Sequence, residues 1–146
     1  METMQKTQTI IGNEFAEKVI PLIKRCKKSI DIIVYDWRWY PTQTGSAIQR
    51  FNNAIINAST KGKKVRAITN RAYIDPVLQK LNIKTKRLYT KKTIHTKLMI
   101  IDNEVAILGS HNYTMNAFAI NFEISLITIE PETVARLKLY FENLWQ

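Results

Sequence analysis

The 146-residue chain has little of the side-chain chemistry on which many enzymes depend. Its single cysteine, Cys26, excludes a disulfide framework or a thiolate metal site within one chain. It has only two histidines, with no carboxylate cluster in the region around them, so we expect neither a metal nor a cofactor. No apolar run approaches the ~20 residues of a membrane span, so we expect no stable membrane insertion.

Acidic residues are also scarce relative to basic ones. Twelve Asp and Glu stand against 22 Lys and Arg, which gives a net charge of +10. On so short a chain this balance favours a polyanionic partner, either nucleic acid or an anionic membrane surface. Residues 1–9 are polar and lack the apolar core of a signal peptide. We therefore expect a cytoplasmic chain, or a periplasmic or secreted one if a signal peptide has been removed.

What the sequence does have is an alternation of helix and strand patterns, which we interpret as one domain over residues 1–146. We expect residues 1–12 to form a flexible N-terminus and Asn13 to be the N-cap of the first helix. Periodicity predicts helices over residues 13–28, 45–60, 75–81, 114–119 and 131–144. It predicts strands over residues 29–35, 65–69, 84–89, 98–101, 105–108 and 121–129. The order predicts an α/β domain with a mixed β-sheet sandwiched between helices and a late hairpin that carries the catalytic residues.

That hairpin covers residues 95–112, where two short apolar strands flank a polar turn. The turn is centred either on Asn103 and Glu104 or on Asp102 and Asn103. The two alternatives differ in strand pairing by two residues, an even number. Each side chain therefore lies on the same face of the hairpin in either case. Under this parity Asp102 lies opposite the proposed phosphate-binding face, which favours a turn or helix-capping role for it. His111 also lies on the opposite face and is interpreted as structural.

The same parity predicts that His95, Lys97, Ser110 and Asn112 emerge together at the open end of the hairpin. An imidazole can attack phosphorus and give a phosphohistidine, while an ammonium, a hydroxyl and an amide hold the phosphoryl oxygens. Glu123, on the polar face of strand 121–129, is placed to accept from the second ring nitrogen of His95 and to fix its tautomer. Each residue alone is more often structural, and it is their combined spacing that favours a site.

The spacing His-x-Lys-x4-Asp followed by x6-Gly-Ser-x-Asn resembles the signature of the phospholipase D superfamily. Glu123 matches the acidic residue that follows the signature, and Asn70 stands where an Asp is common. The resemblance implies a phospholipase D-like fold and a catalytic set that includes Asp102. Every signature position is matched, by His95, Lys97, Asp102, Gly109, Ser110 and Asn112.

The resemblance also implies a metal-independent mechanism with two histidines. One attacks phosphorus, the other protonates the leaving oxygen, and water then cleaves the phosphohistidine. Larger members of the superfamily carry two copies of the signature, whereas this chain carries one. The resemblance therefore implies a homodimer in which His95 of each protomer contributes to a shared site.

Three stretches bear on the substrate. A basic run approaches His95, and within it Arg87, Lys91 and Lys92 are candidates for binding a phosphate backbone. Trp37, Arg38 and Trp39 follow a central strand and are candidates for stacking on unpaired bases. Packing of these aromatics in the core or at a dimer interface is an equal alternative. A second basic stretch, comprising Lys61, Lys63, Lys64 and Arg66, is interpreted as a solvated face.

These observations predict a small dimeric nuclease that acts on DNA or RNA with little sequence preference, because no stretch resembles a base-reading module. The first alternative is a phospholipid phosphodiesterase of the cardiolipin type, which uses the same chemistry on an anionic membrane. The second alternative is a nucleic-acid-binding protein without catalytic activity.

Overall fold

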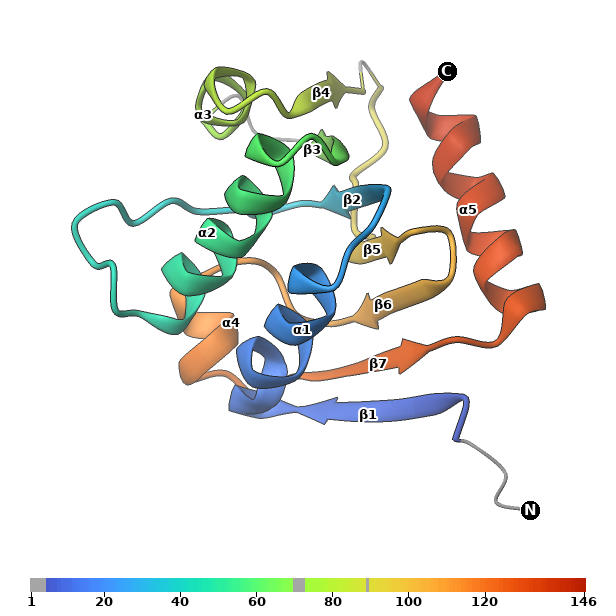
Figure 1. Ribbon diagram of the computed structural model, residues 1–146, viewed down its shortest axis with the longest axis horizontal. Coiled ribbons are helices and arrows are strands. Elements are labelled where there is room, and N and C mark those ends of the chain that lie inside the picture. Colours follow the sequence, from blue (N-terminus) through green and yellow to red (C-terminus); the bar gives the residue numbers. More distant parts are fainter. Residues whose placement is uncertain (1–4, 70–72, 89) are drawn as a thin grey trace.

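A seven-stranded mixed sheet forms the centre of the molecule (Figure 1). The computed structural model describes residues 5–69, 73–88 and 90–146, so Asn70 and the last residue of the predicted strand 84–89 lie outside the described residues. The strands are β1 (Thr7–Ile11), β2 (Ser29–Val34), β3 (Lys64–Thr69), β4 (Lys84–Arg87), β5 (Leu98–Ile101), β6 (Val105–Gly109) and β7 (Ile124–Thr128). The helices are η1 (Gly12–Glu14), α1 (Phe15–Lys24), α2 (Ala47–Thr60), α3 (Asp75–Lys80), α4 (Met115–Ala119) and α5 (Pro131–Trp145).

Strand direction decides which residues meet at the edge of the sheet. The strands lie in the order β1-β7-β6-β5-β2-β3-β4, and only the β2–β3 and β3–β4 pairs are parallel. The antiparallel pairs β1–β7, β7–β6, β6–β5 and β5–β2 complete the sheet. The carboxyl ends of β2 and β6 therefore open at the same edge as the amino ends of β5 and β7. That edge, which we call the site edge, receives His95, Ser110 and Glu123.

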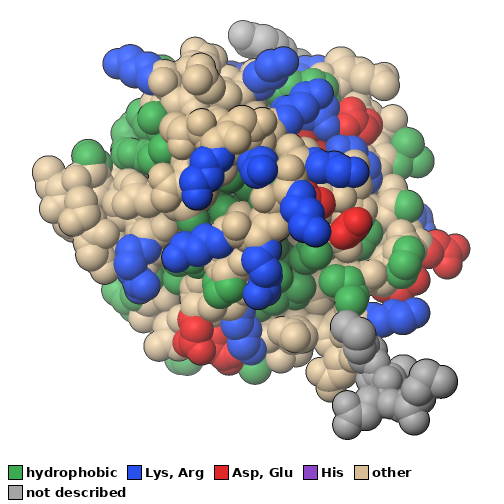
Figure 2. All heavy atoms as spheres, viewed as in Figure 1, with side chains coloured by type: hydrophobic (Ala, Val, Ile, Leu, Met, Phe, Trp, Pro, Cys, Tyr) green, Lys and Arg blue, Asp and Glu red, His purple; other side chains and the backbone are tan. Residues whose placement is uncertain are grey.

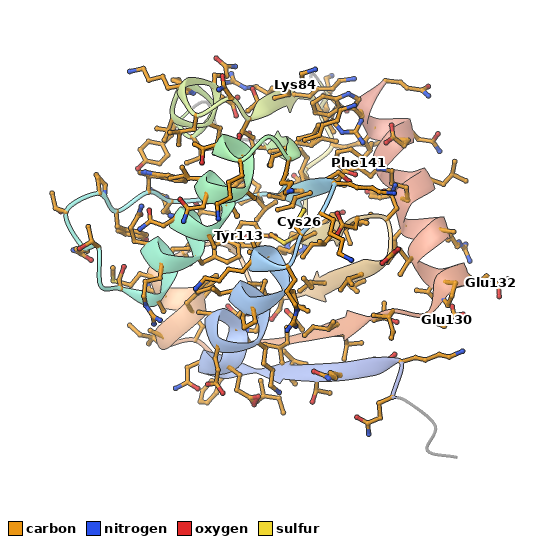
Figure 3. All side chains as sticks on the ribbon, viewed as in Figure 1. Cys26, Lys84, Tyr113, Glu130, Glu132 and Phe141 are labelled. Atoms are coloured by element: carbon orange, nitrogen blue, oxygen red, sulfur yellow. The ribbon has the colours of Figure 1, made fainter. Side chains whose placement is uncertain are left out.

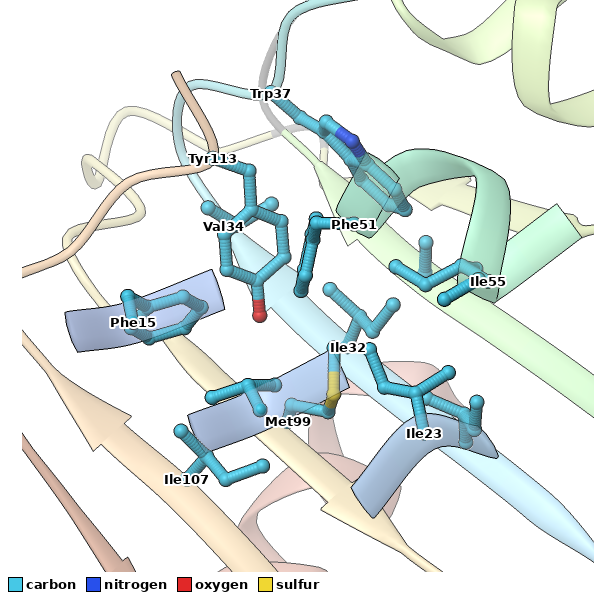
Figure 4. Close-up of a cluster of buried hydrophobic side chains, with 14 of the residues drawn as sticks. Phe15, Ile23, Ile32, Val34, Trp37, Phe51, Ile55, Met99, Ile107 and Tyr113 are labelled. Atoms are coloured by element: carbon cyan, nitrogen blue, oxygen red, sulfur yellow. The ribbon is translucent and has the colours of Figure 1, made fainter. Parts of the chain in front are cut away.

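Helices cover both faces of the sheet, as the sequence predicts. On one face α1, α2 and α4 enclose the larger core, where Phe51 and Ile55 of α2 pack near Phe15 and Ile32 (Figure 4). Burial of each such side chain stabilises the fold by roughly 1.5–3 kcal/mol. Ser46 begins α2 by accepting a hydrogen bond from the Gln49 amide at 3.3 Å.

The opposite face has a smaller core beneath α5. Val134 and Phe141, seven positions apart on one side of α5, are buried against Ile33, Leu98 and Ile100. Figure 3 shows Phe141 directed from α5 toward the sheet. The α/β class and the two-sided covering of a mixed sheet are thus confirmed.

The N-terminal region differs from the prediction. Thr7–Ile11 is not flexible but forms the edge strand β1, which pairs antiparallel with β7 and buries Ile10. The strand was missed because its stability depends on β7, more than a hundred residues away, and not on its own weak apolar pattern. Asn13 lies in η1 and caps no helix, and α1 begins at Phe15 and ends at Lys24.

The hairpin turn also differs from both predicted registers. Leu98 pairs with Leu108 and Ile101 pairs with Val105, so three residues and not two form the turn. Asp102 and Asn103 adopt left-handed backbone angles, with φ of 55° and 58°, which Asp and Asn tolerate better than most residues. A register change of one residue exchanges the faces. Lys97 therefore lies level with Gly109 and not with Ser110, and the predicted shared face is wrong.

Candidate active site

His95 and Lys97 lie at the site edge, in the segment that enters β5. His95 is exposed, and the Lys97 Nζ donates to the His95 carbonyl oxygen at 3.0 Å. Both residues line a hollow of about 430 Å³, together with Gly109 of β6 and Leu137 and Tyr140 of α5. An exposed imidazole beside an ammonium is an arrangement that can attack and neutralise a phosphoryl group.

Ser110 and Glu123 are brought together by the pairing of β6 with β7. The Ser110 hydroxyl donates to Glu123 Oε1 at 2.5 Å and accepts from the Ile124 amide at 3.0 Å. Asn121 donates to the other carboxylate oxygen at 3.2 Å. The Glu123 carboxylate is therefore held by Ser110 and Asn121. The predicted hydrogen bond from the His95 ring to the Glu123 carboxylate does not occur among the described residues of this single chain.

Asn112 lies at the site edge in a second hollow. Its Oδ1 accepts from the Asp36 amide at 3.3 Å. This hollow, of about 450 Å³, is also lined by Arg38, Asn121 and Glu123. The predicted polar set is thus gathered at one sheet edge but divided, with His95 and Lys97 in one hollow and Asn112 and Glu123 in the other.

Asp102 occupies the opposite end of β5 from His95. Its carboxylate accepts from the amides of Lys27, Lys28 and Ser29 at 2.7–3.0 Å and from the Cys26 thiol at 3.4 Å. Partial burial opposes ionisation, but the three amides outweigh it and lower the pKa of Asp102. The structure therefore corrects its inclusion in the catalytic set and supports the turn role. Burial, with Asp102 alongside, raises the pKa of Cys26 to about 11 and keeps this thiol protonated.

Replacing Asp102 with alanine should destabilise the fold by about 1–3 kcal/mol, because the three amides lose their common acceptor. Asp102→Asn should lose less stability, since its one side-chain oxygen can still accept hydrogen bonds from these amides. Urea titration followed by circular dichroism measures both changes. The pKa of Asp102 is lower in the folded than in the unfolded state. Its contribution to stability is therefore present above its unfolded pKa near 3.9 and is lost as the pH falls through its folded pKa. Equal stability of wild type and Asp102→Ala across this range would contradict the assigned role.

His111 is buried and structural, which agrees with its predicted role although the observed register removes the parity on which that prediction rested. Its Nε2 lies 2.8 Å from the Gly12 carbonyl, and its Nδ1 lies 2.7 Å from the Ser125 hydroxyl. The ring packs on Phe15 with centroids 4.7 Å apart. Burial lowers the pKa of His111, so the ring is neutral with both nitrogens occupied. It is not available to act as a second catalytic histidine.

The glycine of the signature is required by the packing of β6 against β7. A Cβ on Gly109 would lie 2.4 Å from the Cα of Ser125 and 2.5 Å from the Ile124 carbonyl oxygen. Both contacts are with backbone, so a side chain would force the strands apart and disturb Ser110 next to it. The signature spacing marks this glycine, but only the strand pairing explains it.

In the aromatic segment after β2, Trp37 is unavailable for base stacking. Trp37 is fully buried, and its indole donates to Asn52 Oδ1 at 2.8 Å. Trp39 is half-buried and packs on Trp37, with ring centroids 6.3 Å apart. The prediction of base stacking is thus wrong for Trp37, and the core alternative is correct (Figure 4). Arg38 forms an ion pair with Asp36 at 2.7 Å at the edge of the Asn112 hollow.

The basic residues differ widely in their surroundings. Lys91 and Lys92 are exposed, whereas Arg87 is held by Asp75 at 3.0 Å. Arg66 is buried and ion-paired, so it does not belong to the solvated face to which the sequence assigned it. Lys and Arg side chains are spread over the face that carries α1 and α2 (Figure 2). The positive charge is therefore broad and extends well beyond His95.

Fold and site together define an α/β domain with an exposed histidine–lysine pair at the edge of its sheet. Residues 19–145 match the family described as cardiolipin synthase, PLD-like domain. The chain belongs to this PLD-like family of the phospholipase D superfamily, a superfamily of phosphodiesterases. Among the described residues, no group of three His, Cys, Asp or Glu side chains is placed to hold a metal ion. None of the described helices has the length and apolarity needed to cross a bilayer.

Similar proteins agree on this fold. NucT from Helicobacter pylori superposes with a TM-score of 0.79 at 24% identity, over 96% of this chain and 95% of NucT. Probable cardiolipin synthase YwiE of Bacillus subtilis is 27% identical over 118 residues, which are 72% of this chain and 23% of YwiE. The mitochondrial cardiolipin hydrolase of Xenopus tropicalis is 25% identical over 136 residues, which are 88% of this chain and 60% of the hydrolase. The chain thus spans only part of the length of both relatives.

Proposed function

We propose that this chain is a phosphodiesterase that cleaves DNA or RNA with little sequence preference, without metal, through a phosphohistidine on His95. The observation that carries the proposal is the exposed His95 in the same hollow as the Lys97 ammonium. The net charge of +10 supports a polyanionic substrate. Lys91 and Lys92 are exposed on the segment that leads to His95 and add to this positive charge.

In the proposed reaction His95 attacks phosphorus while Lys97 neutralises the non-bridging oxygens. The bond from phosphorus to the leaving oxygen breaks, and that oxygen takes a proton from a second histidine. Water then attacks the phosphohistidine, releasing the product phosphate and free His95. His111 cannot supply the proton because it is buried with both ring nitrogens engaged. The second histidine must therefore come from another copy of the chain, so the active form is a homodimer.

An exposed apolar strip beside the site supports this dimer. The strip consists of Ile11, Phe122, Ile124 and Leu126, of which Phe122 is fully exposed and Ile124 is 60% exposed. Three of these residues line a hollow of about 440 Å³ with Ser110 and Glu123. A contiguous apolar patch is unfavourable in water and is often an interaction surface. A two-fold contact through this strip would bring two copies of the site edge together.

A second candidate, a phospholipid phosphodiesterase of the cardiolipin type, is favoured by a specific observation. The matching family and the Xenopus tropicalis relative both carry cardiolipin in their descriptions. The same apolar strip could also contact a lipid surface next to Ser110 and Glu123. A binding protein without catalytic activity is disfavoured by the exposed histidine–lysine pair.

Purified protein should cleave labelled single-stranded DNA, duplex DNA or RNA in the presence of excess EDTA, because no step uses a metal. Cardiolipin liposomes serve as the competing substrate, and the products are resolved by electrophoresis and by thin-layer chromatography. Complete inhibition by EDTA that added metal reverses would contradict the metal-independent mechanism. Hydrolysis of liposomes alone would contradict the choice of nucleic acid and favour the second candidate.

The dimer is tested in the same preparation. Sedimentation should report a dimer, and Phe122→Asp in the strip should shift it to monomer and reduce cleavage. Lys61→Glu, a charge change on an exposed lysine at the end of α2, is the matched control and should leave the dimer intact. A monomer that cleaves at the full rate would contradict the shared site.

A further inference from the structure

A second cavity adjoins the hollow of His95 and is not used by the proposed mechanism. It has a volume of about 540 Å³ and lies between α5 and residues 86–88 and 90–96. Thr96 and Tyr140 line both spaces, so the cavity adjoins the hollow at these two residues. The Tyr140 hydroxyl lies 3.2 Å from the Thr96 hydroxyl, which places the tyrosine ring at the junction.

The lining of this cavity combines apolar surface with a few polar groups. Ile94 is buried, and Leu88 and Leu144 are half-buried parts of the smaller core. Asn143 is exposed at the cavity, and within the part of the chain that the structure describes its side-chain amide makes no hydrogen bond. Lys92 is exposed at the cavity and forms no ion pair there with any described residue. A volume of this size, an apolar lining and a small number of polar groups are typical of a small-molecule site.

We infer that this cavity binds the base of a nucleotide next to the scissile phosphate, so that the enzyme selects unpaired nucleic acid. The inference rests on the proposed function. A base offers two apolar faces to Leu88, Ile94 and Leu144 and a polar edge to the Asn143 amide, which can both donate and accept. Lys92 is placed to hold the phosphate of the same nucleotide. A base that is paired and stacked in a duplex cannot enter such a cavity.

The chemistry of the lining favours a base over an acyl chain. An acyl chain in this cavity would cover the Asn143 amide without giving it a hydrogen-bond partner. It would also lie against Lys92 without neutralising it. A nucleotide satisfies the amide with its base edge and the lysine with its phosphate.

The test compares three substrates: a labelled single strand, the same strand in a duplex, and methyl 4-nitrophenyl phosphate, which has no base. Wild type should cleave the single strand with a kcat/KM at least ~10-fold above that of the duplex. Asn143→Ala should reduce kcat/KM on the single strand by about 5–10-fold, mainly through KM, because one hydrogen bond is lost. Thr93→Trp should fill the cavity and so reduce kcat/KM on the single strand by roughly 10–100-fold, because base stacking is prevented.

Neither variant should change the duplex or methyl 4-nitrophenyl phosphate rates by more than about two-fold. Asn57→Ala, on the exposed side of α2, is the matched control and should behave as wild type. Thermal melting within a few degrees of wild type confirms that both variants fold. The base subsite is overturned if the protein cleaves nucleic acid without a preference for single strands, or if neither variant reduces that preference. Either result leaves the proposed function standing. A wild-type protein that cleaves only cardiolipin liposomes overturns both.

Discussion

Replacing His95 with alanine will reduce the proposed nucleic-acid cleavage by roughly 10⁴-fold or more, because the proposed nucleophile is removed and no other described histidine can replace it. His111 is buried with both ring nitrogens engaged. Binding should be retained, since the positive charge around the site is unchanged. Cleavage is followed with a labelled oligonucleotide, and binding is followed by fluorescence anisotropy at the same salt concentration.

The variant should fold normally. The imidazole of His95 is exposed, and its backbone carbonyl accepts a hydrogen bond from the Lys97 Nζ. Asn57→Ala, on the exposed side of α2, is the matched control and should keep most of the activity. Mixing wild type with His95→Ala should lower the activity per wild-type chain, because heterodimers have one histidine in place of two. Cleavage by pure His95→Ala at a substantial rate would disprove the nucleophile assignment.

The sequence predicts the chemistry of this site better than its geometry. The spacing of His95, Lys97, Gly109, Ser110 and Asn112 indicates a phosphodiester site, and the strand directions do bring these residues to one sheet edge. The shared face predicted from strand parity is nevertheless wrong. It depended on the number of turn residues, and Asp and Asn are tolerated in both two-residue and three-residue turns. The residues meet because they lie beyond the ends of neighbouring strands, where alternation no longer fixes their direction.

Tertiary contacts decided the other points that the sequence left open. Trp37 was as compatible with the core as with a binding surface, and the acceptor Asn52 on α2 fixed it in the core. The edge strand β1 exists only because β7 offers it a partner. Glu123 has the right residue type for an orienting carboxylate, but β6 and β7 place Ser110 within its reach. None of these partners is a neighbour in the sequence.

Replacing Arg66 with alanine will lower the free energy of unfolding by about 3–5 kcal/mol, because it breaks a buried ion pair and leaves Asp31 inadequately neutralised. Asp31 and Arg66 are opposite each other on β2 and β3, and Arg66 Nε donates to Asp31 Oδ1 at 2.8 Å. Arg66 also reaches Glu142 of α5 at 2.5 Å, and its guanidinium lies over the Phe141 ring at 4.8 Å. Urea titration should show a lower midpoint with an unchanged slope.

The matched control removes both charges of the pair. Asp31→Val combined with Arg66→Met should lose much less stability than Arg66→Ala, because no uncompensated charge stays buried. Lys138, the other cation beside Asp31, is partly exposed and can turn to solvent. Equal losses in the single and double variants would show that lost packing, not an unpaired charge, causes the effect.

The ion pairs also connect the core to the site. The Arg66 and Lys138 side chains hold Glu142, and the Arg66 hydrogen bond, which outweighs desolvation, lowers the pKa of that carboxyl. The contribution of Glu142 to stability is therefore present above its unfolded pKa near 4.3 and is lost as the pH falls through its folded pKa. Because α5 supplies Leu137 and Tyr140 to the hollow of His95, loosening α5 should also widen the site. Arg66→Ala should accordingly raise KM for nucleic acid even where the protein is still folded, and the double variant, which also lacks the Arg66–Glu142 ion pair, should raise it too.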